Sequence, residues 1–418
     1  MSPIKESGRS GIGLRQSRSR SLLVAGETAL ALILLIGAVL LIRSFVAIRA
    51  VNRGFETHNV LALHMSLAGT HFDNTLAFSR LVQQATQRID SLPGVIASSA
   101  MSAVPLETKS GLPFDIAGRP LAQGAVRVGW VSVSPGYFEV FRIPIERGRG
   151  FAERDDHSAP GVAIINQAMV RTFWRDRNPI GERIILGKGF APGFDEPARE
   201  IVGIAADIRD EALDIPASPT IYVPIAQMAE GITALFAHVA PIGFVVRAHV
   251  APQALRPAIE AELRQVSGGL PVSGVESMDD VTVRSTARSD FNTLLMNIFG
   301  GVALLLAAIG MYGLMSYSVQ QRTPEMGIRQ ALGADSSTVR NMVVFEGMRL
   351  AFIGIIVGVA GAVILARLMT GFLFGVTPWD PIVFATVPAL VSAVALLAVW
   401  IPARRAARID PAEALRHS

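Results

Sequence analysis

Four long apolar runs stand out from the rest of the chain, which mixes hydrophobic and polar positions. A helix needs roughly 20 residues to cross a hydrocarbon core about 30 Å thick, and each run is at least about that long. The runs lie at 22–42, 291–319, 350–374 and 382–403. Asp290 is followed by no charged residue until Arg322, and Asp380 by none until Arg404. The pattern therefore predicts four transmembrane helices.

The long stretch between the first two runs, 48–285, has the patterns of a water-soluble domain. "NVLALHMSL" begins with strand-like alternation, whereas "TLAFSRLVQQATQRIDSLPGV" has Leu81, Ala85, Ile89 and Leu92 at helical spacing. "REIVGIAADIR", "TIYVPI" and "GFVVRAHV" are typical of strands, and "QALRPAIEAELRQV" is typical of a helix. The glycine- and proline-containing segment 187–197 is predicted to be a long surface loop. We expect an α+β domain with its own core.

These elements predict a multi-pass α-helical membrane protein with four transmembrane helices and a large α+β extracytoplasmic domain between helices 1 and 2. Lys and Arg residues concentrate in the tail 1–21, the loop 320–340 and the C-terminal tail, while the loop 375–381 has none. Cytoplasmic loops of membrane proteins carry an excess of basic residues, so we expect both termini in the cytoplasm. The expected location is the inner membrane of a bacterial cell. Arg43, Arg49 and Arg53, just after the first run, do not fit this rule.

A cleaved signal peptide is the alternative for the first run, but the apolar region of such a peptide is normally only about 7–15 residues long. Half of the residues are hydrophobic, 17% are charged and the mean hydropathy is +0.42, which agrees with a membrane protein. The α+β domain must fold without disulfides, since the chain has no cysteine. The net charge of +4 is modest and gives no reason to expect nucleic acid as a partner.

No motif predicts a catalytic, cofactor-binding or metal site. "GERIILGK", 181–188, resembles a phosphate-binding loop, but five residues separate its glycines instead of four and Gly189 follows the lysine. The histidines form no HExxH pattern, and no GxSxG is present. Glu27 lies within the first run, where an ionisable group is a functional hypothesis by default. Its place near the cytoplasmic end favours a structural role, and Arg367, near the outer end, can snorkel.

Small residues recur at helical spacing in the third run, at Gly354, Gly358 and Gly361. Such a face permits close approach of two helices. It suits either packing within one subunit or a dimer face.

The polar segment 320–340 separates the second and third runs. Good helix formers begin at Glu325, "LGA" supplies a glycine stop, and Asp335 can cap a following amphipathic helix that leads into the third run. A short cytoplasmic helix attached to two membrane helices is suited to transmit a push. The alternative is a solvated connector whose arginines only set the topology.

Several of these segments resemble a known family. "YGLMSYSVQQRTPEMGIRQALGA", "LFGVTPWDP" and "PARRAARIDPAEALR" are similar to the FtsX-like permease domain of ABC transporters, here 290–418. "VSVSPGYFEVFRIPIERGRGF", "NPIGERI" and "IVGIAADIR" resemble the external core domain of MacB-like permeases, here 48–285. The opening "SRSRSLLVAGETALALILLIGAVLLIRSF" is similar to the second unit of tandem permeases, so the chain is either a single-unit protein or half of a tandem one.

The resemblance implies a permease subunit that couples ATP hydrolysis by a separate cytoplasmic ATPase to motion of the external domain, for export or mechanotransmission. It implies no cofactor. The implied partners are the ATPase, a second permease unit as homodimer or paired half, membrane lipid and an extracytoplasmic protein. The implied ATPase-coupling helix comprises Glu325, Gly327, Arg329, Ala331, Gly333 and Ala334. The C-terminal family motif comprises Pro402, Arg404, Arg405, Asp410, Pro411 and Leu415. A membrane-anchored sensor or scaffold without transport is the alternative function.

The predicted topology can be tested with single cysteines, because the chain has no native thiol. An impermeant thiol reagent added to intact cells should label Ser158→Cys in the α+β domain and leave Ser336→Cys unlabelled. Opening the cells should expose both positions. Equal labelling of the two positions in intact cells would contradict the orientation.

Overall fold

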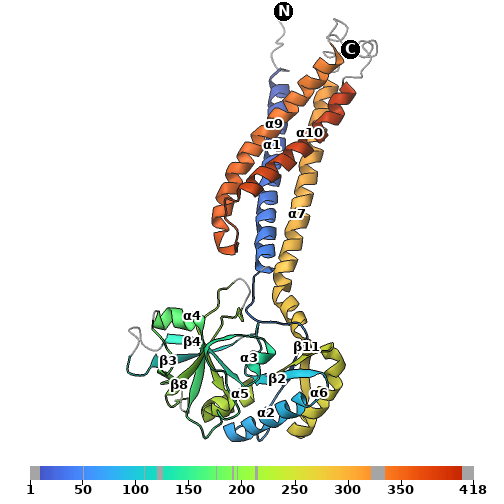
Figure 1. Ribbon diagram of the computed structural model, residues 1–418. Helices are drawn as coiled ribbons and strands as arrows, with labels where there is room; N and C mark the ends of the chain where they lie inside the picture. Colours follow the sequence, from blue (N-terminus) through green and yellow to red (C-terminus); the bar gives the residue numbers. More distant parts are fainter. Residues whose placement is uncertain are drawn as a thin grey trace, which may run out of the picture. The chain divides into compact units, whose positions relative to one another are not determined.

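The computed structural model describes residues 10–49, 51–107, 109–119, 126–175, 177–190, 193–194, 196–211, 215–321 and 335–406. The chain divides into two compact units (Figure 1). We call the first, residues 1–50 and 288–418, the membrane unit, and the second, residues 51–287, the α+β domain. Each unit is described separately.

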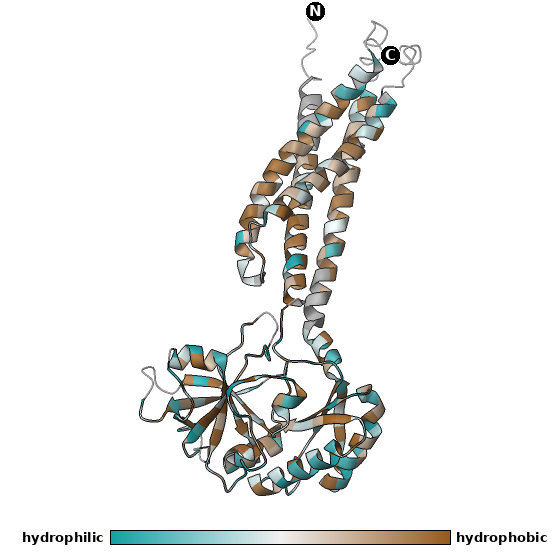
Figure 2. Cartoon of the chain, viewed as in Figure 1, coloured by the Kyte–Doolittle hydropathy of each residue, from teal (hydrophilic) through white to brown (hydrophobic). Residues whose placement is uncertain are grey.

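The membrane unit is built from long helices that carry the apolar runs. They are α1 (Ser10–Arg49), α7 (Met278–Gln321), α9 (Ser336–Leu368) and α10 (Pro381–Ala406). Each contains a segment long and apolar enough to cross a membrane, and apolar residues cover most of these segments (Figure 2). The prediction of four membrane-spanning helices is thus confirmed. The helices also extend into polar sequence at some ends, since backbone hydrogen bonding within a helix does not depend on lipid.

Helices α1 and α9 pack closely. They run in the same direction, since successive residues along α9 contact successive turns along α1. Leu32, Ile36 and Leu40 on α1 are buried with Ile355 and Ala362 on α9. Helix α10 joins the same cluster through Val383, Val387 and Val391. Helix α9 ends at Leu368, before the apolar run does, and a short 3-10 turn (Thr370–Phe372) follows.

The α+β domain contains one hydrogen-bonded sheet of 11 strands in the order β11-β1-β10-β2-β4-β3-β7-β8-β6-β9, with β5 paired to β8. The strands are β1 (Val60–Met65), β2 (Val95–Met101), β3 (Ser110–Ile116), β4 (Val126–Val133), β5 (Ile145–Gly148), β6 (Val162–Asn166), β7 (Arg183–Leu186), β8 (Arg199–Ala205), β9 (Thr220–Pro224), β10 (Ile242–Ala248) and β11 (Val272–Ser277). Strand β9 also pairs in parallel with β4, so six of the strands form a closed ring of pairings. A ring of this kind leaves fewer unpaired strand edges.

The remaining elements of the domain are helical and mostly short. They are α2 (Thr75–Asp90), α3 (Tyr137–Val140), α4 (Gln167–Met169), a π-helical turn (Val170–Trp174), a 3-10 turn (Ile225–Gln227), α5 (Glu230–Val239) and α6 (Pro252–Ser267). Helices α2 and α6 lie beside each other (Figure 1). The side chains of Leu81, Ala85 and Ile89 on α2 are buried, as their helical spacing predicted.

Both faces of the sheet are buried against separate hydrophobic clusters. Along β1, Leu61 and Leu63 belong to the cluster under α2 and α6, whereas Val60 and Ala62 belong to the cluster around Tyr137 of α3. Successive side chains of a strand point to opposite faces, so one strand supplies both clusters. The alternation seen in "NVLALHMSL" therefore separates two cores rather than a core from solvent.

The segment 187–197, predicted to be a surface loop, is partly buried. Phe194 and Glu196 are both buried, and the Glu196 carboxylate accepts a hydrogen bond from Arg199 Nε at 2.6 Å. The side chain of Arg199 is only 2% exposed, and its guanidinium also donates to Gln227 Oε1. The described part of the segment is a loop, as predicted, but the expected surface position was wrong for these two residues. The ion pair with Arg199 holds Glu196 inside the domain.

Replacing Glu196 by Ala should destabilise the α+β domain strongly. It leaves the buried Arg199 guanidinium without its carboxylate, a change that costs about 3–5 kcal/mol in comparable sites. The matched control is Arg256→Ala, which removes an exposed pair with Glu260 on α6 and should cost less than about 0.5 kcal/mol. Denaturant unfolding of the purified chain measures both, and equal costs would contradict the assigned role.

Candidate functional site

The three glycines predicted as a packing or dimer face lie against α1 of the same chain. A methyl group placed on Gly354 would lie 2.7 Å from Thr28 Cβ, and one on Gly358 would lie 2.9 Å from Leu32 Cδ2. On Gly361 it would lie 2.6 Å from Ile33 Cδ1. A larger side chain at 354 or 358 would also meet backbone atoms of α1, whereas one at 361 would displace the Ile33 side chain. The face therefore allows the close α1–α9 contact.

An ion pair fixes the end of α1 to the start of α10. Arg43 Nη1 lies 2.5 Å from Asp380 Oδ2, and Asp380 Oδ1 accepts a hydrogen bond from the Ile382 amide at 3.0 Å. One residue further along α1, the Ser44 hydroxyl accepts a hydrogen bond from the Phe374 amide at 2.8 Å. Asp380 thus neutralises Arg43 and also caps α10. This pairing explains how one of the arginines that did not fit the charge rule is accommodated.

The arginines near the ends of α9 and α10 rest on aromatic side chains. The Arg367 guanidinium lies 4.9 Å from the ring centre of Trp379, and the Arg404 guanidinium lies 5.4 Å from that of Trp400. Arg405 Nη1 donates to the Tyr312 hydroxyl at 3.1 Å, which ties α10 to α7. Arg367 is exposed and stacks on Trp379.

The structure places part of the predicted C-terminal motif and none of the coupling helix. Pro402, Arg404 and Arg405 lie in the last turns of α10. The other members of both groups lie outside the described residues: Glu325, Gly327, Arg329, Ala331, Gly333, Ala334, Asp410, Pro411 and Leu415. Their grouping stays a prediction.

The segment that resembled a phosphate-binding loop is a strand with its turns. Arg183–Leu186 form β7, which pairs with β3 and β8. Gly187 has a φ of +71°, and a methyl group on it would lie 2.2 Å from the Phe194 carbonyl oxygen. This glycine therefore serves a tight turn of the α+β domain.

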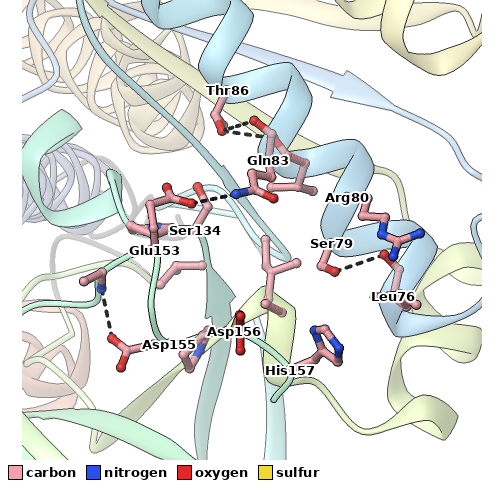
Figure 3. Close-up of a pocket in the computed structure, with 17 residues that line it drawn as sticks. Leu76, Ser79, Arg80, Gln83, Thr86, Ser134, Glu153, Asp155, Asp156 and His157 are labelled. Atoms are coloured by element: carbon pink, nitrogen blue, oxygen red, sulfur yellow. Dashed lines mark hydrogen bonds between the residues drawn. The ribbon is translucent and has the colours of Figure 1, made fainter. Parts of the chain in front are cut away.

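A pocket of about 190 Å³ opens beside α2 in the α+β domain (Figure 3). Its apolar lining includes Val82 and Ile225, and its polar lining includes Arg80 and His157. Gln83 Nε2 donates to Glu153 Oε2 at 3.0 Å and so connects α2 to the loop that follows β5. The pocket is large enough for a small organic group or a protein side chain.

The acidic residues of that loop are held by hydrogen bonds. Burial acts to raise the pKa of Asp155, but the bidentate Arg149 guanidinium and the Ala152 amide lower it overall. The Ser158 hydroxyl and amide lower the pKa of Asp156. Both carboxylates are therefore ionised at neutral pH and rigidly placed. Among the residues that the structure describes, no three His, Asp or Glu side chains converge as a metal site would require.

The Arg43–Asp380 pair was not predicted from the sequence. The unexpected arginine after the first run was a signal for the pair, because an arginine near lipid needs a partner. The partner itself lies far away in the chain, at the start of another predicted helix. Only the packing of the helices brings the two side chains together.

A double-mutant cycle should detect the Arg43–Asp380 pair. Arg43→Gln and Asp380→Asn remove the charges, and Asn at 380 keeps a side chain able to cap α10. We expect a coupling free energy of about 1 kcal/mol, reduced by the partial exposure of Arg43. Unfolding in mixed detergent measures it. Arg404→Gln with Asp380→Asn is the control and should be additive, whereas additivity of the Arg43 cycle would show that the pair contributes nothing.

Comparison with known proteins places both units in recognised families. Residues 27–266 match the MacB-like periplasmic core domain and residues 297–411 match the FtsX-like permease C-terminal family. The periplasmic region of MacB from Actinobacillus actinomycetemcomitans aligns with a TM-score of 0.37 and 13% identity, over 58% of this chain and 97% of that one.

Three relatives illustrate the range of similar proteins. The probable syringafactin export ATP-binding/permease protein SyfD of Pseudomonas syringae pv. tomato is 29% identical over 68% of this chain and 41% of its own length. The macrolide export ATP-binding/permease protein MacB of Mannheimia succiniciproducens is 28% identical over 67% and 42%. The uncharacterized ABC transporter permease YknZ of Bacillus subtilis is 26% identical over 68% and 69%.

The chain thus matches only about two fifths of the length of the two ATP-binding/permease relatives. The matches nevertheless cover both the α+β domain and the membrane unit, in the order that the resemblance predicted. The chain belongs to the family of ABC transporter permeases that combine a MacB-like periplasmic core domain with an FtsX-like permease C-terminal.

Proposed function

We propose that this chain is the membrane subunit of an export-type ABC transporter that transmits work from a separate cytoplasmic ATPase to the α+β domain on the other side of the membrane. Export is supported by the names of relatives such as SyfD and MacB, and a permease made as its own chain is supported by YknZ. The proposed orientation has both termini in the cytoplasm. The proposed membrane is the bacterial inner membrane.

The course of α7 is the observation that carries this proposal. Its first residue, Met278, is buried in the core of the α+β domain, and its last, Gln321, precedes the segment 322–334. On the proposed topology that segment faces the cytoplasm. A movement imposed on it would pass directly into α7, and α1 would provide the second covalent connection to the α+β domain.

The ATPase is proposed to dock on the loop 320–340, with Glu325 and Arg329 on one face of its helix. Residues four apart on a helix are neighbours, and an exposed pair of this kind contributes only about 0.3–0.5 kcal/mol. A pair of this strength would contribute little to folding, which leaves both residues available for contact with a partner. A second permease unit would complete the transporter, as a homodimer or paired half.

Arg329→Glu should uncouple the ATPase without unfolding the permease. A like charge placed against an interface that expects a cation can cost several kcal/mol, so partner affinity should fall about tenfold or more. The measurement is binding and stimulated hydrolysis with the ATPase that co-purifies with the chain. Arg329→Lys keeps the cation and should retain most of both.

The melting profile of the permease should be the same in all three proteins, and the permease alone should not hydrolyse ATP. If Arg329→Glu keeps full affinity and stimulation, the loop is only a connector and the docking assignment is wrong. A change in melting would instead mean that Arg329 belongs to the fold.

A further inference from the structure

Glu27 is an ionisable residue in the apolar part of α1, and its side chain contacts α7. A methyl group placed on Gly310 would lie 2.1 Å from Glu27 Oε2 and 3.3 Å from its Cδ. The carboxyl group therefore occupies the space that a side chain at 310 would need. The backbone does not call for glycine here, since α7 is an ordinary helix, but a larger residue at 310 would displace the Glu27 carboxyl group from its present position.

The contact lacks a hydrogen bond. Glu27 Oε2 is buried, and no donor among the described residues reaches it. A carboxyl oxygen placed in apolar surroundings without a donor costs free energy, which offsets the gain from close packing. By contrast, Thr28 on the neighbouring face of α1 donates to the Val24 carbonyl at 2.8 Å, so the α1–α9 contact carries no such cost at this level.

Helix α7 is also the least buried of the four membrane-length helices. Only 17% of its most apolar segment is buried in the described structure, compared with 44% for α1. It meets α1 again near Gly300, where a methyl group would lie 3.7 Å from Ala38 Cβ. Helices α1, α9 and α10 share one hydrophobic cluster, to which α7 contributes only the partly buried Leu304. In a second, smaller cluster, Met311 of α7 is buried with Val24 of α1 and Ala351 of α9.

We propose that the Glu27–Gly310 contact is a releasable joint, at which α7 separates from α1 while α1, α9 and α10 stay together. The unpaired carboxyl oxygen keeps the packed and separated arrangements close in free energy. The inference uses the membrane unit alone. It extends the proposed function, because α7 is the helix that leads into the loop 320–340, but its test needs no ATPase.

A disulfide between α1 and α7 reports on the joint. Ala38→Cys and Gly300→Cys would bring their Cβ atoms to 3.7 Å, within the roughly 3.5–4.5 Å found in disulfides. The chain has no other cysteine, so mild oxidation in membrane vesicles gives one intramolecular product, which non-reducing electrophoresis separates from any disulfide between two chains. Its rate of formation measures how often the two helices are packed.

Two substitutions in this double-cysteine background should change the rate in opposite directions. Glu27→Leu removes the unpaired oxygen at similar volume and should raise the rate about threefold or more. Gly310→Ala places a methyl group in the space that the Glu27 carboxyl group occupies, and it should lower the rate by a similar factor. Gly313→Ala, on the same helix with no atom within 4 Å of the added methyl group, is the control and should leave it unchanged.

Rescue separates this contact from a general effect on α7. Glu27→Ala combined with Gly310→Ala makes room for the methyl group and should restore the rate. An unchanged or lower rate in Glu27→Leu would overturn the proposal, because the carboxyl would then stabilise the packed arrangement. If Gly310→Ala does not insert into the membrane, the Glu27→Leu result alone decides. Failure of this test leaves the ATPase-docking proposal standing, and the reverse also holds.

Discussion

Hydrocarbon offers no hydrogen-bond partners, and this constraint shapes the whole membrane unit. Backbone groups must bond within each segment, which leaves helices as the solution for this chain. The polar side chains of α1 then need partners nearby: Thr28 bonds to its own helix, Ser44 accepts from the Phe374 amide and Arg43 pairs with Asp380. Glu27 Oε2 and Arg43 Nη1 are both buried without a hydrogen bond among the described residues, but Arg43 Nη1 lies 2.5 Å from the Asp380 carboxylate, whereas no donor reaches Glu27 Oε2. An exception to such a strict constraint is a reason to look for a role.

The α+β domain satisfies a different constraint, which is to bury enough apolar surface in water without a disulfide. It does so by covering both faces of its sheet, so that strands such as β1, β4 and β6 each contribute to two hydrophobic clusters. Its buried charged groups are paired: Arg199 with Glu196, and Lys109 with Asp210 at 2.9 Å. Removing one partner of such a pair leaves the other charge buried and unpaired. Substitutions at these positions are therefore expected to lower the stability of the domain.

The two units are joined in the chain by α1 and α7, and these two helices pack differently within the membrane unit. Helix α1 is the most buried of the four and shares glycine-lined contacts with α9, whereas α7 has few buried positions. On the releasable joint proposed between Glu27 and Gly310, these two covalent connections to the α+β domain would move separately.

The sequence by itself determined the number of membrane helices, the α+β character of the long domain and the family, because lipid demands long apolar runs and strands impose alternation. It also located the small face of Gly354, although not what that face contacts. The partner of Arg43, the buried state of Glu196 and the meeting of Glu27 with Gly310 were decided by the tertiary structure. Each of these joins side chains from segments that the sequence treats separately, and only helix packing and sheet closure set which of them meet. The pattern of hydrophobic and polar residues along one segment depends on whether lipid or water surrounds it. Which two distant side chains meet depends on how the helices and strands pack, and no single segment contains that information.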